Sequence, residues 1–407
     1  MIRLRGARLV TPEGVRDGQA VGLADGHIIE IAADRAASAA DVDCAGGWLV
    51  PGFIDTHVHG VGGVDVLAGG DAVARVAAML PRYGVTAFLP TSVACPPDVL
   101  ATFLAAVGRA TALEGASSAR VLGAHLESNF IAPDYKGAQP ARCLRRPPVP
   151  GEPLLHEGTF TGAAILATID QHAPAVRIVT VAPELPHALD LIARLAAAGH
   201  RVSLGHSGAT YEEGRAGIAA GARHATHLFN RMPPFTHRAP GLAGAVLGAP
   251  EVTCEVIVDG VHVHPGAIAL AVRARGPEGI SAITDGTAAS GLPVGAVTAL
   301  GEHEIHVRAD RAELADGTLA GSVATMDGVF RRLVHDVRLD IGEAVRLTAT
   351  TPAEAAGRPE LGRLAVGAAA DLVWLDDHFR VRRTWVAGRV AWNSGGAADV
   401  SPAEVRR

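Results

Sequence analysis

The chain has 407 residues, of which 48% are hydrophobic and only 4% aromatic, and its formal net charge is −6. Acidic and basic residues are interspersed, which argues against a nucleic-acid-binding surface, and no apolar run reaches the roughly 18 residues of a membrane helix. The first residues lack the apolar core of a signal peptide, so we expect a cytoplasmic protein without a membrane partner. Four cysteines lie far apart without a CxxC pair, which predicts reduced thiols: Cys44, Cys95, Cys143 and Cys254.

Both ends of the chain predict short strands. Residues 2–10 alternate between apolar and polar side chains, and the runs 20–23 and 27–31 flank Asp25-Gly26 as a hairpin would. The C-terminal end contains three β-rich runs, at 371–375, 381–386 and 389–392. We therefore predict one small sheet domain formed from residues 1–50 and 356–407 together.

The middle of the chain, residues 51–355, alternates β-rich apolar runs with helical stretches rich in Ala, Leu and Arg. Strands are expected at 86–90, 121–126, 177–181, 201–205, 224–228 and 280–284, and helices at 97–108, 186–198 and 211–220. Repeated strand–helix units predict a parallel α/β architecture, most simply a (β/α)₈ barrel. The alternative is a doubly wound open sheet, but that fold requires a glycine-rich phosphate loop after its first strand, and residues 60–63 match one poorly.

Polar side chains stand at the ends of several predicted strands. His57 and His59 end an apolar run and, being two residues apart, point to the same face. In a chain with 18 histidines this pair alone is a weak sign, and packed or surface histidines are the alternative. The pattern recurs, however, at the ends of four later strands, at Glu127, His206, His227 and Asp285. Barrel enzymes place their active sites at this end of the strands.

Imidazole and carboxylate ligands suit a divalent ion such as Zn²⁺, and they also accept Fe, Mn, Co or Ni. A bound ion lowers the pKa of water to about 7 and polarises a carbonyl, so the pattern indicates a metal-dependent hydrolase. Asp285 is the natural residue to take up a proton and pass it to a leaving group. A non-catalytic metal-binding protein is the alternative, but it predicts missing ligands, and all six positions are filled.

Other segments have the character of binding loops. Arg238 suits bidentate contact with a phosphate or carboxylate, although a solvated surface arginine is the alternative. His262 and His264 repeat the same-face spacing, with structural histidines in a strand as the alternative. The glycine-containing segments 286–291 and 319–322 predict tight loops that let the backbone approach a ligand.

These residues together resemble a known family, the N-acetylglucosamine-6-phosphate deacetylases of the amidohydrolase superfamily. The resemblance runs nearly from end to end, and the motifs that carry it are PGFIDTHVHG (51–60), GAHLE (123–127), KGAQP (136–140), TVAPE (180–184), GHSGAT (205–210), ATHLFNRMPP (225–234), HRAPG (237–241), DGVHVHP (259–265), ITDGTAASGLP (283–293), LAGS (319–322) and GRLAVGAAADLVWLD (362–376). It implies a barrel with a small β-sandwich from both termini, a homodimer, and hydrolysis of the N-acetyl group of a phosphorylated amino sugar.

The resemblance also implies roles for individual residues. The principal metal ligands would be Glu127, His206 and His227. Asp285 would be the catalytic acid and base. Some members lack the HxH pair and hold one ion. Because this chain keeps His57 and His59, a second ion bridged by Glu127 is expected.

The sugar phosphate, by the same resemblance, would be contacted by Asn230, Arg238 and His262, with Arg238 reaching across the dimer interface. The chain departs from the family at Ser128-Asn129, where Gly-Pro is usual, and this departure bears on the choice of substrate. N-acetylgalactosamine-6-phosphate is therefore an alternative substrate. A cyclic amide is another, but enzymes of that type usually bridge two ions with a carboxylated lysine, which Glu127 argues against. The sequence assigns no role to Gln139.

Overall fold

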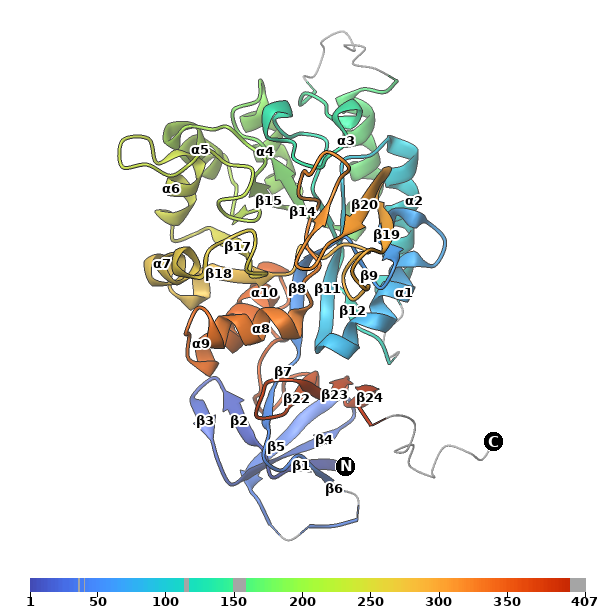
Figure 1. The fold of residues 1–407 in the computed structure, drawn as a ribbon, viewed down its shortest axis with the longest axis vertical. Helices are drawn as coiled ribbons and strands as arrows, with labels where there is room; N and C mark the ends of the chain where they lie inside the picture. The colour runs from blue at the N-terminus through green and yellow to red at the C-terminus, as the bar shows by residue number, and fades with distance from the viewer. Residues whose placement is uncertain (36, 40, 113–116, 149–158, 396–407) are drawn as a thin grey trace.

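A computed structural model describes residues 1–35, 37–39, 41–112, 117–148 and 159–395 (Figure 1). Its central feature is a nine-stranded parallel sheet, in which the short strand β12 (Arg120–Val121) pairs with β11. The other eight strands pair in chain order: β8 (Phe53–Val58), β11 (Val85–Ser92), β13 (Ala124–Leu126), β14 (Val176–Val181), β15 (Arg201–Leu204), β16 (His224–Ala225), β17 (Thr253–Ile257) and β18 (Ile280–Ile283). A parallel bridge between Val58 and Gly286 joins the first strand to the end of the last. The predicted (β/α)₈ barrel is thus confirmed.

Helices follow the barrel strands as the sequence predicts. They are α1 (Ala72–Met79), α2 (Pro97–Thr111), α3 (Gly162–Gln171), α4 (Ala188–Ala197), α5 (Tyr211–Ala219), α6 (Gly241–Leu247), α7 (Pro265–Arg275), α8 (Met326–His335), α9 (Ile341–Val345) and α10 (Thr351–Ala355), with a π-helical turn at Arg346–Thr350. The start of α5 is set by a capping box, in which Thr210 and Glu213 each accept a backbone N–H of the other. No helix in the described part of the chain combines the length and the apolar character needed to cross a bilayer.

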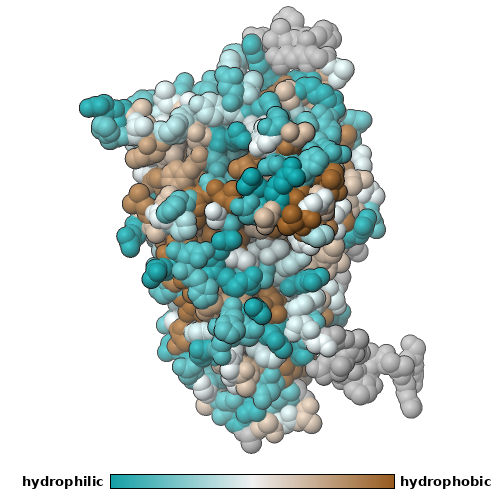
Figure 2. All heavy atoms as spheres, viewed as in Figure 1, coloured by the Kyte–Doolittle hydropathy of each residue, from teal (hydrophilic) through white to brown (hydrophobic). Residues whose placement is uncertain are grey.

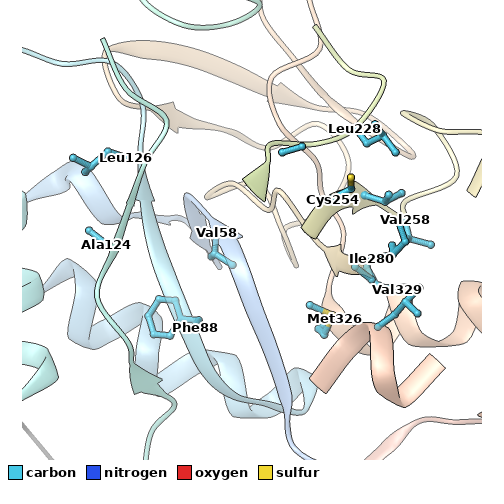
Figure 3. Close-up of a cluster of buried hydrophobic side chains, with 14 of the residues drawn as sticks. Val58, Phe88, Ala124, Leu126, Leu228, Cys254, Val258, Ile280, Met326 and Val329 are labelled. Carbon is cyan, nitrogen blue, oxygen red and sulfur yellow. The ribbon is translucent and has the colours of Figure 1, made fainter. Parts of the chain in front are cut away.

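The main core lies between the barrel and these helices. Every residue of β8 and β11 is buried, because the barrel interior covers one face of each strand and the helices cover the other. Figure 3 shows Val58, Phe88 and Ala124 on neighbouring strands, and Ile280 near Val329 of α8 on another part of the wall. On the outer face drawn in Figure 2, hydrophilic and hydrophobic residues are interspersed.

Both ends of the chain form two further sheets, which lie together at one end of the molecule (Figure 1). The first has the order β5-β4-β1-β6 and the second the order β24-β23-β22-β7-β2-β3. Their strands are β1 (Ile2–Arg5), β2 (Arg8–Thr11), β3 (Gly14–Arg16), β4 (Gln19–Ala24), β5 (His27–Ala33), β6 (Asp41–Asp43), β7 (Trp48–Pro51), β22 (Leu372–Leu375), β23 (Val381–Val386) and β24 (Arg389–Asn393). Leu4 and Val21 of one sheet share a hydrophobic cluster with Leu49 and Trp385 of the other. Residues 396–407 of the predicted second segment lie outside the described residues.

Short strands lie at the rim of the barrel. They are β9 (Gly60–Val61), β10 (Val64–Asp65), β19 (Val297–Leu300), β20 (His303–Val307) and β21 (Ala312–Glu313). The expected strand 121–126 is divided into β12 (Arg120–Val121) and β13, because Gly123 adopts a φ of +114° that interrupts the extended backbone. The expected strand 224–228 ends at Ala225 for a similar reason, since His227 has a φ of +31°.

The placement of His262 and His264 in a strand is wrong. β17 ends at Ile257, and both histidines lie in the loop that leads to α7, where His264 caps the helix N-terminus. The Asp259 side chain turns the backbone here, because its Oδ1 accepts the N–H groups of Val261 and His262 at 2.8 and 2.9 Å. This local turn overrides the alternation that suggested a strand.

Candidate metal centre and active site

The six residues predicted from the strand ends meet at one mouth of the barrel. Glu127 directly follows β13, whereas His206, His227 and Asp285 each stand two residues beyond the end of their strand. These last three have positive φ angles, of +47°, +31° and +49°. Left-handed backbone is unfavourable for residues other than glycine and is often found at functional sites. All six side chains are buried.

Three of these side chains could together hold a metal ion, and we call them the first ligand group. Glu127 Oε1 lies 2.7 Å from His206 Nε2 and 2.9 Å from His227 Nε2, and the two nitrogens are 2.9 Å apart. The three atoms face one another instead of distinct hydrogen-bond partners. Such convergence of imidazole and carboxylate atoms is what a divalent ion requires.

The second ligand group consists of His57, His59 and Asp285. The two Nε2 atoms are 3.3 Å apart, and Asp285 Oδ1 lies 3.4 Å from His57 Nε2 and 3.2 Å from His59 Nε2. Glu127 borders this group too, with Oε1 3.6 Å from His57 Nε2 and Oε2 3.6 Å from His59 Nε2. One carboxylate therefore stands between two sets of ligands.

In three of the histidines, Nδ1 has a hydrogen-bond partner that fixes the orientation of the ring. His59 Nδ1 lies 3.0 Å from the Thr91 carbonyl, and His206 Nδ1 lies 2.8 Å from the Tyr135 carbonyl. His57 Nδ1 lies 3.0 Å from Glu255 Oε2. A carbonyl or carboxylate oxygen accepts a hydrogen bond, so Nδ1 donates in each ring and Nε2 is left facing the ligand groups.

Charge in the site also favours a cation. Burial raises the pKa of Glu127, but the imidazole of His206 and those around it outweigh burial and hold this pKa well below its usual range. Burial likewise opposes ionisation of Asp285, and His57 and His59 lower its pKa. Burial lowers the pKa of His57, yet the charges of Asp285, Glu255 and Glu127 raise it to about 10. The two ionised carboxylates and the converging imidazole nitrogens fit a divalent metal ion.

Two glycine-containing loops were expected to approach a ligand. Leu319 and Gly321 line the cavity, and Gly321, with a φ of +53°, packs so closely that an added Cβ would lie 2.7 Å from the Asp285 carbonyl oxygen. The segment 286–291 does not line the cavity, which corrects the expectation for it. It closes the barrel instead, because the Gly286 carbonyl accepts the His59 N–H at 2.7 Å.

The two candidate ligand groups open into a cavity of about 400 Å³. Tyr135, Asn230, Arg231 and His262 are among the residues that line it. His262 Nδ1 donates to Asp259 Oδ2 at 2.6 Å, and this contact outweighs burial and raises the pKa of His262. The cavity therefore offers two cationic side chains, a guanidinium and a histidine biased towards its charged form.

Arg238 is not brought to this site within the subunit. It is exposed in the loop before α6 and does not line the cavity. The Asn230 amide does line it, but it donates at 3.3 Å to the carbonyls of His227 and Leu228. Arg231, which lines the cavity, is the guanidinium that this subunit supplies.

Ser128 and Asn129, the departure from the family pattern, are buried and do not line the cavity. Ser128 Oγ donates to the Thr180 carbonyl at 2.5 Å, and Asn129 Nδ2 donates to the carbonyls of Cys95 and Cys143 at 2.9 and 2.7 Å. Both side chains thus satisfy buried backbone beside Glu127. Their contacts support the surrounding loops and give no direct contact to a ligand.

Two residues beside the metal-ligand groups had no predicted role. Gln139 donates through Nε2 to Glu127 Oε2, and its Oε1 accepts the Ala94 N–H at 2.7 Å. Glu255 accepts from His57. The only signal of Glu255 in the sequence is a lone acidic residue within the apolar run of β17.

Comparison with known proteins assigns this chain to a family. The model of the amidohydrolase family matches residues 48–391. The chain belongs to the amidohydrolase family. This amidohydrolase is 32% identical over 389 residues to N-acetylglucosamine-6-phosphate deacetylase of Lysinibacillus sphaericus, covering 95% of this chain and 97% of that protein. It is 36% identical over 392 residues to N-acetylgalactosamine-6-phosphate deacetylase of Escherichia coli O157:H7, covering 95% and 98%.

A solved structure agrees with these relatives. An aspartate-to-alanine variant of N-acetyl-D-glucosamine-6-phosphate deacetylase from Mycobacterium smegmatis, in complex with N-acetyl-D-glucosamine-6-phosphate, superposes on this amidohydrolase with a TM-score of 0.87. The two are 35% identical, and the match covers 96% of this chain and 99% of that one. The similarity therefore includes the barrel and the sheets formed by the chain ends.

Proposed function

We propose that this amidohydrolase hydrolyses the acetamido group of N-acetylglucosamine-6-phosphate, giving glucosamine-6-phosphate and acetate. The observation that carries the proposal is a buried carboxylate, Glu127, between two ligand groups at the floor of a cavity that also holds Arg231 and His262. Ligands of this kind suit amide hydrolysis, and two cationic side chains suit a phosphate. The deacetylases named above support this choice of substrate.

The ligand residues divide between two ions in this proposal. Glu127, His206 and His227 hold the first, and His57 and His59 with Asp285 hold the second, with Glu127 shared. Zn²⁺ is the ion we propose, since its preference is for imidazole and carboxylate. When bound, such an ion supplies Lewis acidity, which activates water and polarises a carbonyl.

Asp285 moves the proton in the proposed reaction. Its lowered pKa keeps it ionised near neutral pH, so a carboxylate oxygen accepts a proton from the attacking water. The same carboxyl then delivers that proton to the amide nitrogen as the carbon–nitrogen bond breaks. The acetyl group leaves as acetate with the oxygen of the attacking water, and the sugar retains the amine.

The phosphate end of the substrate is assigned to residues at the cavity wall. His262, oriented by Asp259, donates from Nε2 in this proposal, and Arg231 and Asn230 line the same cavity. We further propose a cytoplasmic homodimer in which Arg238 of each subunit reaches the cavity of the other. The exposure of Arg238 in the loop before α6 supports this role, because a side chain placed there is free to cross an interface.

A test of this crossing uses mixed subunits. The variants Arg238→Ala and Asp285→Asn are each expected to have little activity. A dimer that contains one subunit of each has one site with both native residues, so mixing should restore activity towards one quarter of the wild-type value in a random mixture. Activity that stays at the level of the separate variants would contradict the exchange of Arg238 between subunits.

N-acetylgalactosamine-6-phosphate is a second candidate substrate, because the Escherichia coli relative that acts on it is 36% identical to this chain. The two sugars differ only at one hydroxyl, so a direct assay is needed. Acetate release should be measured with both N-acetyl sugars, each with and without the 6-phosphate, after the metal content has been determined. Highest kcat/KM for N-acetylglucosamine-6-phosphate supports the proposal, and equal turnover of the unphosphorylated sugar would refute the role given to the phosphate.

A further inference from the structure

A second buried polar cluster lies inside the barrel, centred on Glu255 of β17. This carboxylate is 0% exposed. Thr56 Oγ1 donates to its Oε1 at 3.0 Å, and His224 Nε2 lies 3.1 Å from the same oxygen. His125 Nδ1 is 3.8 Å from Oε1, and His57 Nδ1 is 3.0 Å from Oε2. Within the described residues, these three imidazoles are the ion-pair partners of Glu255.

A carboxylate in this position is costly unless it is compensated. Removing an ion from water carries a penalty of several kcal/mol or more, which only close partners offset. Glu255 has such partners, since His57 Nδ1 lies 3.0 Å from Oε2 and His224 Nε2 lies 3.1 Å from Oε1. The barrel interior therefore retains a negative charge that the proposed reaction does not use.

The direction of the contacts links this charge to the ligand groups. Thr56 fixes the carboxylate from one side, and His57 donates to its other oxygen. His57 Nε2 then points away from Glu255 to the atoms of His59 and Asp285. The rings of His59 and His206 are held instead by neutral carbonyl groups. Among these three ligands, only His57 is backed by a charged group.

We propose that Glu255 is a positioning residue for the second metal ion. It fixes the tautomer and the orientation of His57, and its charge makes Nε2 a stronger ligand. This inference rests on the proposed second ion at His57, His59 and Asp285. It predicts that loss of the Glu255 charge weakens that ion selectively. Among the described residues, the hydrogen bonds and ion pairs of the Glu255 carboxylate go to Thr56, His57, His125 and His224, and none goes to the first ligand group.

The test measures binding of each ion directly. Metal-free full-length wild type and Glu255→Gln are titrated with Co²⁺ and then Zn²⁺ in competition with a chelator, and bound metal is counted after gel filtration. The wild type should bind two ions per subunit. In Glu255→Gln the first ion should bind as in the wild type, and the second about 10–100-fold more weakly, as is typical for the loss of such a support.

A second pair of variants keeps the test valid if Glu255→Gln does not fold. Thr56→Val removes the hydroxyl that fixes the carboxylate at nearly constant volume, and Thr56→Ser keeps it. The second ion should be weakened in Thr56→Val and unchanged in Thr56→Ser. Equal weakening of both ions in Glu255→Gln, or unchanged affinity for both, would overturn the role of Glu255. A wild type that binds one ion would overturn the two-ion centre itself, which is a different result.

Discussion

Replacement of Asp285 by asparagine separates proton transfer from metal binding. Asparagine has the same shape and keeps one oxygen, but it cannot accept a proton. The first ligand group does not include Asp285, so the ion at Glu127, His206 and His227 should remain. We therefore expect the variant to contain nearly the same amount of the first ion and to release almost no acetate.

The expected loss of activity follows from the environment of Asp285. Its side chain is buried, and its Oδ1 lies 3.2 Å from His59 Nε2 and 3.4 Å from His57 Nε2, so bulk water has little room to take its place. A positioned acid and base contributes about 10²–10⁴-fold to a rate. This corresponds to about 3–5 kcal/mol of activation free energy. The decrease should be in kcat, because the phosphate contacts that determine binding are unchanged.

The assay is acetate release at saturating substrate, with metal content measured on the same sample. Asp371→Asn is a matched control. Asp371 is equally buried, but it lies beside β22 and pairs with Arg120 at 2.8 Å, far from the ligand groups. That control should lose stability and keep kcat. Wild-type kcat in Asp285→Asn would refute the proton-transfer role, and loss of both ions would show that Asp285 acts mainly as a ligand.

Three further predictions concern metal, pH and the ligand shell. Removal of the metal with a chelator should abolish acetate release, and Zn²⁺ should restore it. The ion should raise the thermal midpoint, and at a concentration of 1,000 times Kd it should raise the free energy of unfolding by about 4 kcal/mol. His262 has a raised pKa in the folded state, so its pairing with Asp259 stabilises below the unfolded value of about 6.5 and is lost as the pH rises through the folded value. The unfolding free energies of wild type and His262→Gln should therefore differ most near pH 6 and converge towards pH 9, and a difference independent of pH would contradict the pairing. Gln139→Leu should destabilise by about 1–3 kcal/mol in urea unfolding, because the buried Ala94 N–H loses its acceptor, whereas Gln139→Glu should keep that acceptor.

The sequence by itself determined the alternation of strands and helices and the strand-end positions of the ligands. Both depend on local patterns. A parallel strand that is buried on both faces must be an apolar run, and a polar residue at its end is visible as the break in that run. Reliance on local patterns also explains why a strand at His262 and His264 was wrong. Their alternation suggested a strand, but the backbone N–H groups of Val261 and His262 donate to Asp259 and form a turn there.

Only the tertiary structure decided which atoms meet. His57 and Asp285 are 228 positions apart, and they come within 3.4 Å because closure of the barrel sets β8 beside the end of β18. The tautomer of His57 depends on Glu255, which a different strand supplies at a depth that only the strand register fixes. Periodicity along a chain contains no information about register between distant strands. For that physical reason, local patterns could name the candidate ligands, and the family resemblance could suggest two ion sites. Only the fold brought Asp285 to His57 and His59 and placed Glu255 behind His57.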